Sequence, residues 1–284
     1  MEQAGPGGLA FICVQSVVVD DQDNLWILDP AAPKTKEIVK GGPKLVKVDL
    51  KTNQIAKTIP FGEEVALAKS YLNDVRIDTK ANTAFITDSG IGAIIVVDLA
   101  SGKARRLLAD HKSTKVEPGT ITVDGKELID MEKNKPPQFA CDGIALDTKT
   151  GYLYYHPLTG HTLYRIKTAD LMNEKLTKTE LETKVENVAQ TPLTDGMLEA
   201  PDGSIYLTDI EGGAIVRWDP AAKKIERVIA DKRLLWPDSL SWGPGGELYV
   251  TASQIENMPK YNGGKSTRTE PYKLFKVTGL ATAP

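Results

Sequence analysis

The chain has 284 residues, of which 41% are hydrophobic and 26% are charged, an ordinary composition that excludes collagen-like, disordered and disulfide-dense proteins. Its formal net charge is −3, and its Lys and Arg residues are scattered singly, so we expect no nucleic-acid partner. The longest candidate apolar run, Ile91–Leu99, is far shorter than the ~18 residues of a membrane-spanning helix, which predicts no membrane insertion.

The sequence contains few signals for export or for the redox state of its cysteines. Met1–Ala10 lacks the basic region and apolar stretch of a secretory signal, so we expect no signal in this chain, although a mature exported form restarted with a new Met would look the same. Cys13 and Cys141 lie far apart and outside any CxxC spacing, which predicts no structural zinc site. Two buried free thiols are the preferred interpretation, and a Cys13–Cys141 disulfide is the alternative.

One sequence pattern recurs five times along the chain. It consists of a polar residue, an alternating apolar run, a turn, and a second apolar run that ends in a polar residue. Such paired runs, rich in Val, Ile, Tyr and Trp and joined by turns of the Pro-Asp-Gly kind, are typical of β-hairpins. The five hairpins are predicted at residues 15–29, 73–88, 142–156, 195–209 and 238–253.

A third strand is predicted after each hairpin, and a turn then leads to a fourth extended stretch, so each repeat predicts a four-stranded meander. The third strands are expected at residues 44–50, 93–99, 162–166, 214–219 and 272–277. Fourth stretches are clearest at residues 104–108 and 224–229. Only Thr168–Lys184 has a helical pattern, whereas a parallel α/β fold needs a helix after nearly every strand. The sequence therefore predicts one all-β domain over residues 1–284, a β-propeller with five visible blade repeats.

The first residue of each repeat is an amide or a carboxylate. These five opening residues are Gln15, Asn73, Asp142, Asp195 and Asp238. In a propeller the innermost strand of each blade lines the central channel, so we expect the opening residues to form a ring at one mouth of that channel. The alternative for each one is a turn former or strand cap, because Asp and Asn are common there for local hydrogen-bond reasons.

The repeats resemble the Yellow and major royal jelly protein family in its bacterial branch. The resemblance covers nearly the whole chain and depends on segments 13–20, 25–30, 71–78, 142–146 with 152–155, and 236–239. It implies a six-bladed propeller, more distantly similar to gluconolactonase and regucalcin, and a secreted or periplasmic location, with the cytoplasm left open. The family has another blade before the segment that begins here near Phe11. Either the chain is truncated, or the ring closes with five blades, or strands from insertions fill the gap.

The gluconolactonase likeness also implies a metal site. There a Glu, an Asn and an Asp hold a divalent cation, and by motif position they correspond to Gln15, Asp142 and Asp195, while a substrate-contacting Asn corresponds to Asn73. Two ligand types differ, yet two carboxylates remain, and an all-oxygen set suits calcium or magnesium better than zinc. Carboxylates crowded at a channel mouth repel by roughly 1–4 kcal/mol per close pair, which a cation, a raised pKa or a bound ammonium would relieve.

These ways of relieving the repulsion lead to three hypotheses for the function. The first is a lactonase or esterase in which a divalent ion, most simply calcium, polarises a cyclic ester and Asp195 acts as general base, with Asn73 and Asp238 near the substrate. The metal could equally serve only to fix blade geometry. The second is an aromatic amine-binding or dopachrome-tautomerase-like protein without metal, with Trp236, Tyr71 and His156 as the ring platform. The third is a non-catalytic interaction scaffold.

Each platform ring has a structural alternative, because aromatic side chains along strands are more often packed in a core. His156 holds a closing position where other repeats carry Asp, so it is a candidate proton carrier, with a turn-flanking hydrogen bonder as the preferred interpretation. Substrate choice in propellers depends on the mouth loops, here mainly residues 31–42, 110–138 and 254–270. Neither the ligand nor the oligomeric state follows from the sequence.

Overall fold

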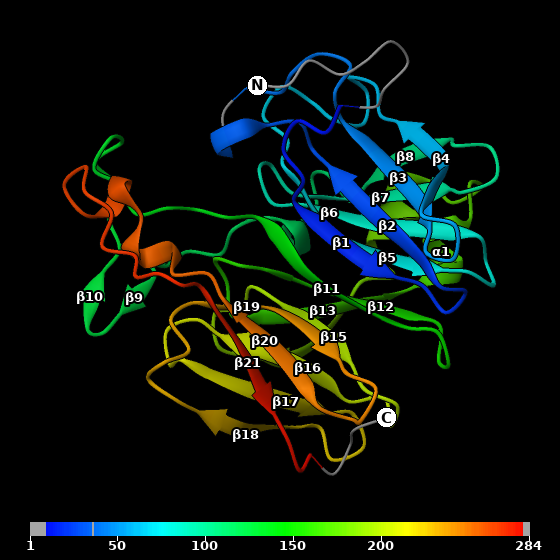
Figure 1. The fold of residues 1–284 in the computed structure, drawn as a ribbon. Coiled ribbons are helices and arrows are strands. Elements are labelled where there is room, and N and C mark those ends of the chain that lie inside the picture. Colours follow the sequence, from blue (N-terminus) through cyan, green and yellow to red (C-terminus); the bar gives the residue numbers. More distant parts are fainter. Residues whose placement is uncertain (1–9, 36, 281–284) are drawn as a thin grey trace. The chain divides into compact units, whose positions relative to one another are not determined.

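The five repeats build five antiparallel sheets in chain order, and within each sheet consecutive strands pair (Figure 1). The computed structural model describes residues 10–35 and 37–280, so the expected absence of a signal in Met1–Ala10 falls almost wholly outside the described residues. The chain divides into two compact units, residues 1–109 and 110–284. One domain over residues 1–284 stays a prediction.

The first unit contains two sheets. The first sheet consists of β1 (Ser16–Val19), β2 (Asn24–Asp29), β3 (Lys44–Asp49) and β4 (Gln54–Pro60), with the short helix η1 (Pro33–Thr35) between β2 and β3. The second consists of β5 (Leu72–Asp78), β6 (Thr83–Asp88), β7 (Ala93–Asp98) and β8 (Ala104–Leu107). Buried residues of both sheets, among them Leu28, Leu45, Ile86 and Ile95, share one apolar core. The burial of this core removes apolar side chains from water and holds the two sheets face to face.

The second unit contains three sheets. The first of these consists of β11 (Cys141–Asp147), β12 (Tyr152–Pro157), β13 (Thr162–Lys167) and β14 (Glu186–Gln190). The next consists of β15 (Met197–Glu199), β16 (Ile205–Asp209), β17 (Ala214–Asp219) and β18 (Lys224–Ala230). The last consists of β19 (Pro237–Trp242), β20 (Leu248–Ala252) and β21 (Lys273–Val277).

The hairpins and third strands predicted from apolar alternation are confirmed. The predicted helical stretch is present as two short helices, α1 (Thr168–Met172) and α2 (Lys178–Glu182), and Thr177 starts α2 with a capping box to Glu180. The prediction of a fourth strand is wrong for the last repeat, whose sheet has three strands among the described residues. There Gly279 has a φ of 75°, a left-handed conformation that turns the backbone out of the sheet direction.

Two of the predicted mouth loops meet in the second unit and form a small cap, defined as residues 110–138 and 254–270. The cap contains η2 (Lys112–Thr114), the hairpin β9 (Thr122–Val123) and β10 (Lys126–Glu127), η3 (Ile255–Asn257) and η4 (Pro259–Tyr261). The backbone N–H of Met131 donates to the carbonyl of Lys260 at 2.9 Å, and Figure 1 shows the β9–β10 hairpin beside η3 and η4. Buried Ile121, Leu128 and Tyr261 pack together beneath it.

Two smaller expectations are also settled by the structure. Both cysteines are free, and Cys141 is buried whereas Cys13 is only partly buried, so the disulfide alternative does not hold in this structure. Among the described residues, no helix combines the length and the apolar character that crossing a membrane requires.

Candidate functional site

The first two opening residues contact each other in the first unit. The side-chain amide of Gln15 donates from Nε2 to Asn73 Oδ1 at 2.7 Å, and the Tyr71 hydroxyl donates to Gln15 Oε1 at 2.6 Å. Asn73 is buried. Three of the predicted site residues therefore form one hydrogen-bonded row across β1 and β5, held by side chains from adjacent sheets.

The other three opening residues come together in the second unit, because the innermost strands of its sheets approach with almost no space between their backbones. A Cβ atom built on Gly143 would lie 2.7 Å from the carbonyl oxygen of Asp195, and one built on Gly196 would lie 1.8 Å from the carbonyl oxygen of Asp238. Only glycine permits such contacts. The glycine after each of two opening residues thus places Asp142, Asp195 and Asp238 on neighbouring strands at the same end.

Irregular pairing sets the direction of several opening residues. The register shifts between Leu72 and Val75, between Cys141 and Gly143, and between Pro237 and Leu240. Asn73, Asp142 and Asp238 lie in these three intervals. A β-bulge adds an unpaired residue, bends the strand and redirects a side chain, and bulges are frequent beside active sites.

In three sheets a threonine on the second strand accepts hydrogen bonds from backbone N–H groups at or just after the opening residue. Thr208 Oγ1 accepts from the backbone N–H groups of Asp195 and Gly196 at 3.1 and 3.0 Å. Thr251 Oγ1 accepts from the N–H of Ser239 at 2.9 Å, and Thr87 Oγ1 accepts from that of Asp74 at 3.2 Å. These N–H groups lie outside the regular strand ladder, so the hydroxyl provides them with an acceptor. A Thr near the end of the second run in three of the five repeats, Thr87, Thr208 and Thr251, was a sequence signal for these contacts that we did not use.

Asp195 is the opening residue whose side chain is most clearly held in place. The indole Nε1 of Trp236 donates to Asp195 Oδ2 at 2.6 Å, and both residues are buried. Trp236 has a φ of 50°, which is unfavourable for a bulky residue. The strain is offset because its ring packs with Ile121 and Leu128 of the cap. Trp236 therefore links the cap to the Asp195 carboxylate. Its ring is buried, and its predicted role in a ligand platform stays a prediction.

His156 has two protein partners and no exposure to solvent. Its Nδ1 donates to the Pro157 carbonyl at 2.7 Å, and its Nε2 accepts from Thr191 Oγ1 at 2.6 Å. Burial lowers the pKa of His156 to about 4, so the ring is neutral at pH 7 and the carbonyl fixes the proton on Nδ1. This environment favours the hydrogen-bonding interpretation over proton transfer at neutral pH, and a substrate contact by His156 stays a prediction.

The closing residue of the first repeat, Asp29, anchors the segment before Gln15. Its carboxylate accepts from the N–H groups of Ile12, Cys13 and Ala31 at 2.7, 3.0 and 2.8 Å and from Lys44 Nζ at 3.0 Å. Burial alone would raise the pKa of Asp29, but these donors lower it overall. Asp29 is thus an ionised structural residue that positions the chain leading into the opening residue.

Glu199 lies at the far end of the strand that follows Asp195. Burial is the main reason why its pKa rises to about 7, and the charges of Asp147 and Asp202 raise it further while Lys149 lowers it. The folded state therefore favours the protonated acid relative to the unfolded chain, in which the pKa is the ordinary 4.5. Ionising Glu199 removes stability as the pH rises from about 4.5 to 7.

Glu199→Gln is expected to remove this pH-dependent loss, because the amide stays neutral at every pH. The Tm of the variant should exceed that of the wild type by a few degrees at pH 8 and should match it near pH 4.5. Thermal melts of both proteins from pH 4.5 to 8.5 measure the difference. An offset that does not change with pH would show that Glu199 does not titrate in this range.

The expected cation ligands fit a hard divalent ion in type but only partly in arrangement. Asp142 and Asp195 offer carboxylate oxygens on neighbouring strands, as calcium prefers. However, Asp195 Oδ2 already accepts from Trp236, and Gln15 Oε1 already accepts from Tyr71. Within residues 10–35 and 37–280, no group of three or more His, Cys, Asp or Glu side chains could hold a metal ion. The divalent cation stays a prediction.

Comparison of the sequence with models of known protein families shows to which family this chain belongs. Residues 12–272 match the family model described as major royal jelly protein. The chain belongs to this family. The predicted resemblance is therefore confirmed, and the matched residues include every blade strand that the structure describes except β21.

The family includes curated relatives from Apis mellifera. Major royal jelly protein 6 is 22% identical over 217 residues, which are 74% of this chain and 48% of that protein. Major royal jelly protein 2 is 29% identical over 166 residues, which are 56% of this chain and 35% of that protein. The chain thus spans about half or less of the length of these relatives.

Solved structures show the fold of this family member. A luciferin-regenerating enzyme aligns with a TM-score of 0.57 at 11% identity, covering 96% of this chain and 93% of its own. A gluconolactonase from Xanthomonas campestris aligns with a TM-score of 0.52 at 11% identity, covering 84% and 69%. A streptogramin B lyase aligns with a TM-score of 0.52 at 12% identity, covering 84% and 61%. The predicted all-β propeller is confirmed, with five blade sheets in the described chain.

Proposed function

We propose that this major royal jelly family member acts on a small organic molecule at the carboxylates of Asp142, Asp195 and Asp238. The observation that carries the proposal is the close approach of the three innermost strands at Gly143 and Gly196, which places the backbones of Asp142, Asp195 and Asp238 next to one another in the second unit. Acidic side chains on adjacent innermost strands are suitable groups for acid–base chemistry on a bound ligand. Three fold neighbours named as a gluconolactonase, a lyase and a luciferin-regenerating enzyme support small-molecule chemistry on this fold.

Ring opening of a lactone is the reaction that these residues support best. Asp195, oriented by the Trp236 N–H at 2.6 Å, would accept a proton from water as the water oxygen bonds to the lactone carbonyl carbon. When the tetrahedral intermediate collapses, the ring C–O bond breaks, and the proton passes from Asp195 to the departing alkoxide. The product is a hydroxy acid. Asp238, which is more exposed than the other two, faces the side from which substrate enters in this proposal.

The proposal also includes a divalent cation, with calcium as the first candidate, for which Asp142 and Asp195 would be ligands. When bound, such an ion would polarise the carbonyl oxygen. Its two carboxylate ligands would then be less repulsive, so the folded protein would gain stability from the ion. We also expect an exported protein, in keeping with the family resemblance.

Removal of metal distinguishes a lactonase that binds a divalent cation from one that works without it. We expect that EDTA lowers the Tm and that added calcium restores it, because an ion that binds only the folded state stabilises it by mass action. Thermal melts of the dialysed protein, with and without EDTA, are paired with elemental analysis of its metal content. A protein without divalent metal, whose Tm is unchanged by EDTA and by calcium, would remove the cation from the proposal.

The reaction itself is tested with a panel of aldonolactones and aliphatic lactones, in which acid release is followed by pH-stat. Saturable turnover proportional to protein concentration supports the lactonase. Absence of turnover over the whole panel would overturn it. If the same protein instead binds serotonin or dopamine saturably, as measured by calorimetry, the amine-binding alternative would take its place.

A further inference from the structure

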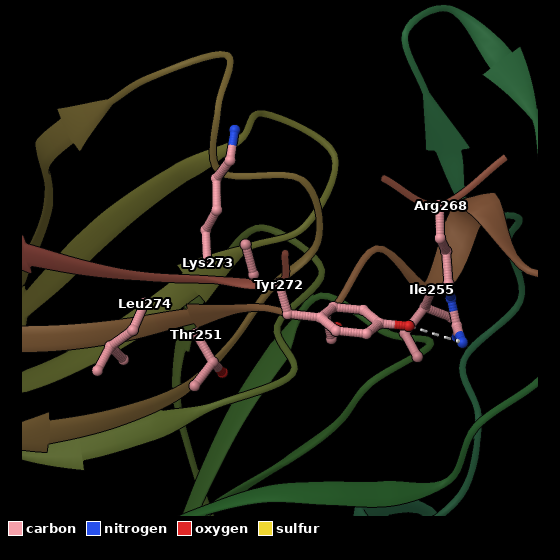
Figure 2. A pocket seen from close by; sticks show the side chains of 8 residues that line it. Thr251, Ile255, Arg268, Tyr272, Lys273 and Leu274 are labelled. Atoms are coloured by element: carbon pink, nitrogen blue, oxygen red, sulfur yellow. Dashed lines mark hydrogen bonds between the residues drawn. The ribbon is translucent and has the colours of Figure 1, made fainter. Parts of the chain in front are cut away.

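A surface cavity that is open to solvent, with a volume of about 560 Å³, lies between the last sheet and the cap (Figure 2). The sheet contributes β20, the residues just after it and the start of β21, and the cap contributes Ile255 and Arg268. In Figure 2 the Tyr272 ring extends from the sheet toward the Arg268 guanidinium of the cap. The volume is in the range of small-ligand sites. The cavity contains none of the opening residues, so it lies outside the proposed catalytic site.

Arg268 is held in position by the protein before any ligand arrives. Its Nε donates to the Gln254 carbonyl at 3.2 Å, and its Nη1 donates to the Tyr272 hydroxyl at 3.4 Å. The side chain of Gln254 is buried and clasps Thr269, with Nε2 donating to the Thr269 carbonyl at 2.9 Å and Oε1 accepting from the Thr269 N–H at 2.9 Å. A guanidinium fixed in this way loses little conformational entropy when it binds an anion.

The charge of Arg268 has no ion-pair partner among the described residues, and neither does that of Lys273. Glu256 interacts electrostatically with Arg268 at longer range, but burial raises the pKa of Glu256 above its ordinary value. A second hollow of about 220 Å³ adjoins the first at Ala252 and Lys273, and it adds Lys232 and Arg233. Of these, Arg233 pairs with Asp231 at 2.6 Å. A cationic, partly apolar surface is therefore present on a chain whose formal net charge is −3.

We propose that this cavity binds an organic anion, namely a carboxylate, sulfate or phosphate group attached to a flat apolar body. The guanidinium of Arg268 pairs with the anionic group, since its planar donors match these oxyanions. The apolar body lies against Ile255, Leu274 and the Tyr272 ring. Lys273 points away from the guanidinium in Figure 2, so it contributes attraction at longer range instead of a second direct contact.

Isothermal titration calorimetry with 1-naphthyl phosphate tests the proposal, with 1-naphthol and inorganic phosphate as partial ligands. We expect saturable binding of 1-naphthyl phosphate and at least about tenfold weaker binding of 1-naphthol, because the charge is the recognised group. Titrations of 1-naphthoate and 1-naphthyl sulfate rank the three anionic groups. Equal affinity for 1-naphthol and 1-naphthyl phosphate would overturn the proposal, because the cavity would then select only the apolar body.

Variants locate the binding. Arg268→Gln is expected to weaken 1-naphthyl phosphate binding about tenfold or more. The control is Lys276→Gln on β21, whose side chain pairs with Glu247 and does not line the cavity, and it should leave the binding unchanged. Leu274→Glu provides a second test that spares the Arg268 contacts, since Leu274 is 64% exposed. It should weaken binding by repulsion, while Leu274→Gln should not.

Wild-type affinity in both Arg268→Gln and Leu274→Glu would contradict the site. Asp195→Asn should bind 1-naphthyl phosphate as the wild type does, so this inference and the proposed lactonase activity can fail independently.

Discussion

Asp195→Asn is expected to lower kcat/KM for the best lactone by about 10²- to 10⁴-fold, because an amide cannot accept the proton of the attacking water. The fold should be retained. Asparagine has nearly the same shape as aspartate, and its carbonyl oxygen can still accept from the Trp236 indole, which now donates at 2.6 Å to the carboxylate. Kinetics by pH-stat and thermal melts of the same preparations measure the two effects separately.

Asp202→Asn is the matched control for this variant. Asp202 belongs to the same sheet but lies in the turn at its opposite end, where it accepts from the Ser204 N–H at 2.9 Å and pairs with Arg217 at 3.1 Å. The loss of such a surface ion pair costs about 1 kcal/mol or less. Turnover should be unchanged in Asp202→Asn. Wild-type kcat/KM in Asp195→Asn would remove Asp195 from the mechanism.

Gly196→Ala is expected to be the most destabilising single methyl addition in the second unit. The new Cβ would lie 1.8 Å from the carbonyl oxygen of Asp238 and 2.8 Å from its carbonyl carbon. Both atoms are backbone, so no side-chain rotation relieves the overlap, and β15 and β19 must separate. Overpacking of this kind costs about 3 kcal/mol or more, measured as the change in free energy of unfolding in urea.

Gly119→Ala adds the same methyl group where no atom lies within 4 Å, so it should leave the free energy of unfolding nearly unchanged. If Gly196→Ala is as stable as Gly119→Ala, the innermost strands do not approach as closely as described here. In that case the convergence of Asp195 and Asp238 would also lose its support. This pair of variants therefore tests the geometry of the site independently of any substrate.

Local patterns were sufficient to predict the sheets. Apolar alternation and turn residues determine where a hairpin begins and ends, so residues such as Trp26, Phe85 and Tyr206 could be assigned to strands from their neighbours alone. The same repetition identified the five opening residues. The capping box at Thr177 and Glu180 is likewise a local signal, and the helical stretch that contains it was predicted correctly.

The details of the site depend on contacts between strands that are distant in sequence. The bulge at Asp142 and the close approach at Gly196 arise where adjacent sheets meet, and no local period reports this. The burial of Trp236 results from cap residues more than a hundred positions earlier, such as Ile121. The role of Trp236 in a ligand platform stays a prediction, and the structure adds its hydrogen bond to Asp195, which no local pattern indicated. Thr208 and Thr251 were visible in the sequence, but their hydrogen bonds to the opening segments are shown only by the structure.

The cap gives the site a property that the repeats alone do not have. One side of Trp236 packs against the cap and its Nε1 contacts Asp195, so a ligand that engages this carboxylate also alters the indole environment. The chain contains four tryptophans. Trp26 donates to Asp20 at 2.8 Å and Trp242 donates to the Glu199 carbonyl at 2.9 Å, so both of these indole N–H groups have acceptors other than the opening carboxylates.

The most direct test of the account is therefore a ¹H–¹⁵N spectrum of the indole N–H groups, with Trp236→Phe used to assign the Trp236 resonance. The hydroxy acid formed from the best lactone is titrated into the ¹⁵N-tryptophan-labelled protein. We expect the Trp236 resonance to shift saturably while those of Trp26 and Trp242 stay in place. A Trp236 resonance that does not move, at product concentrations that inhibit turnover, would show that the functional site does not include Asp195.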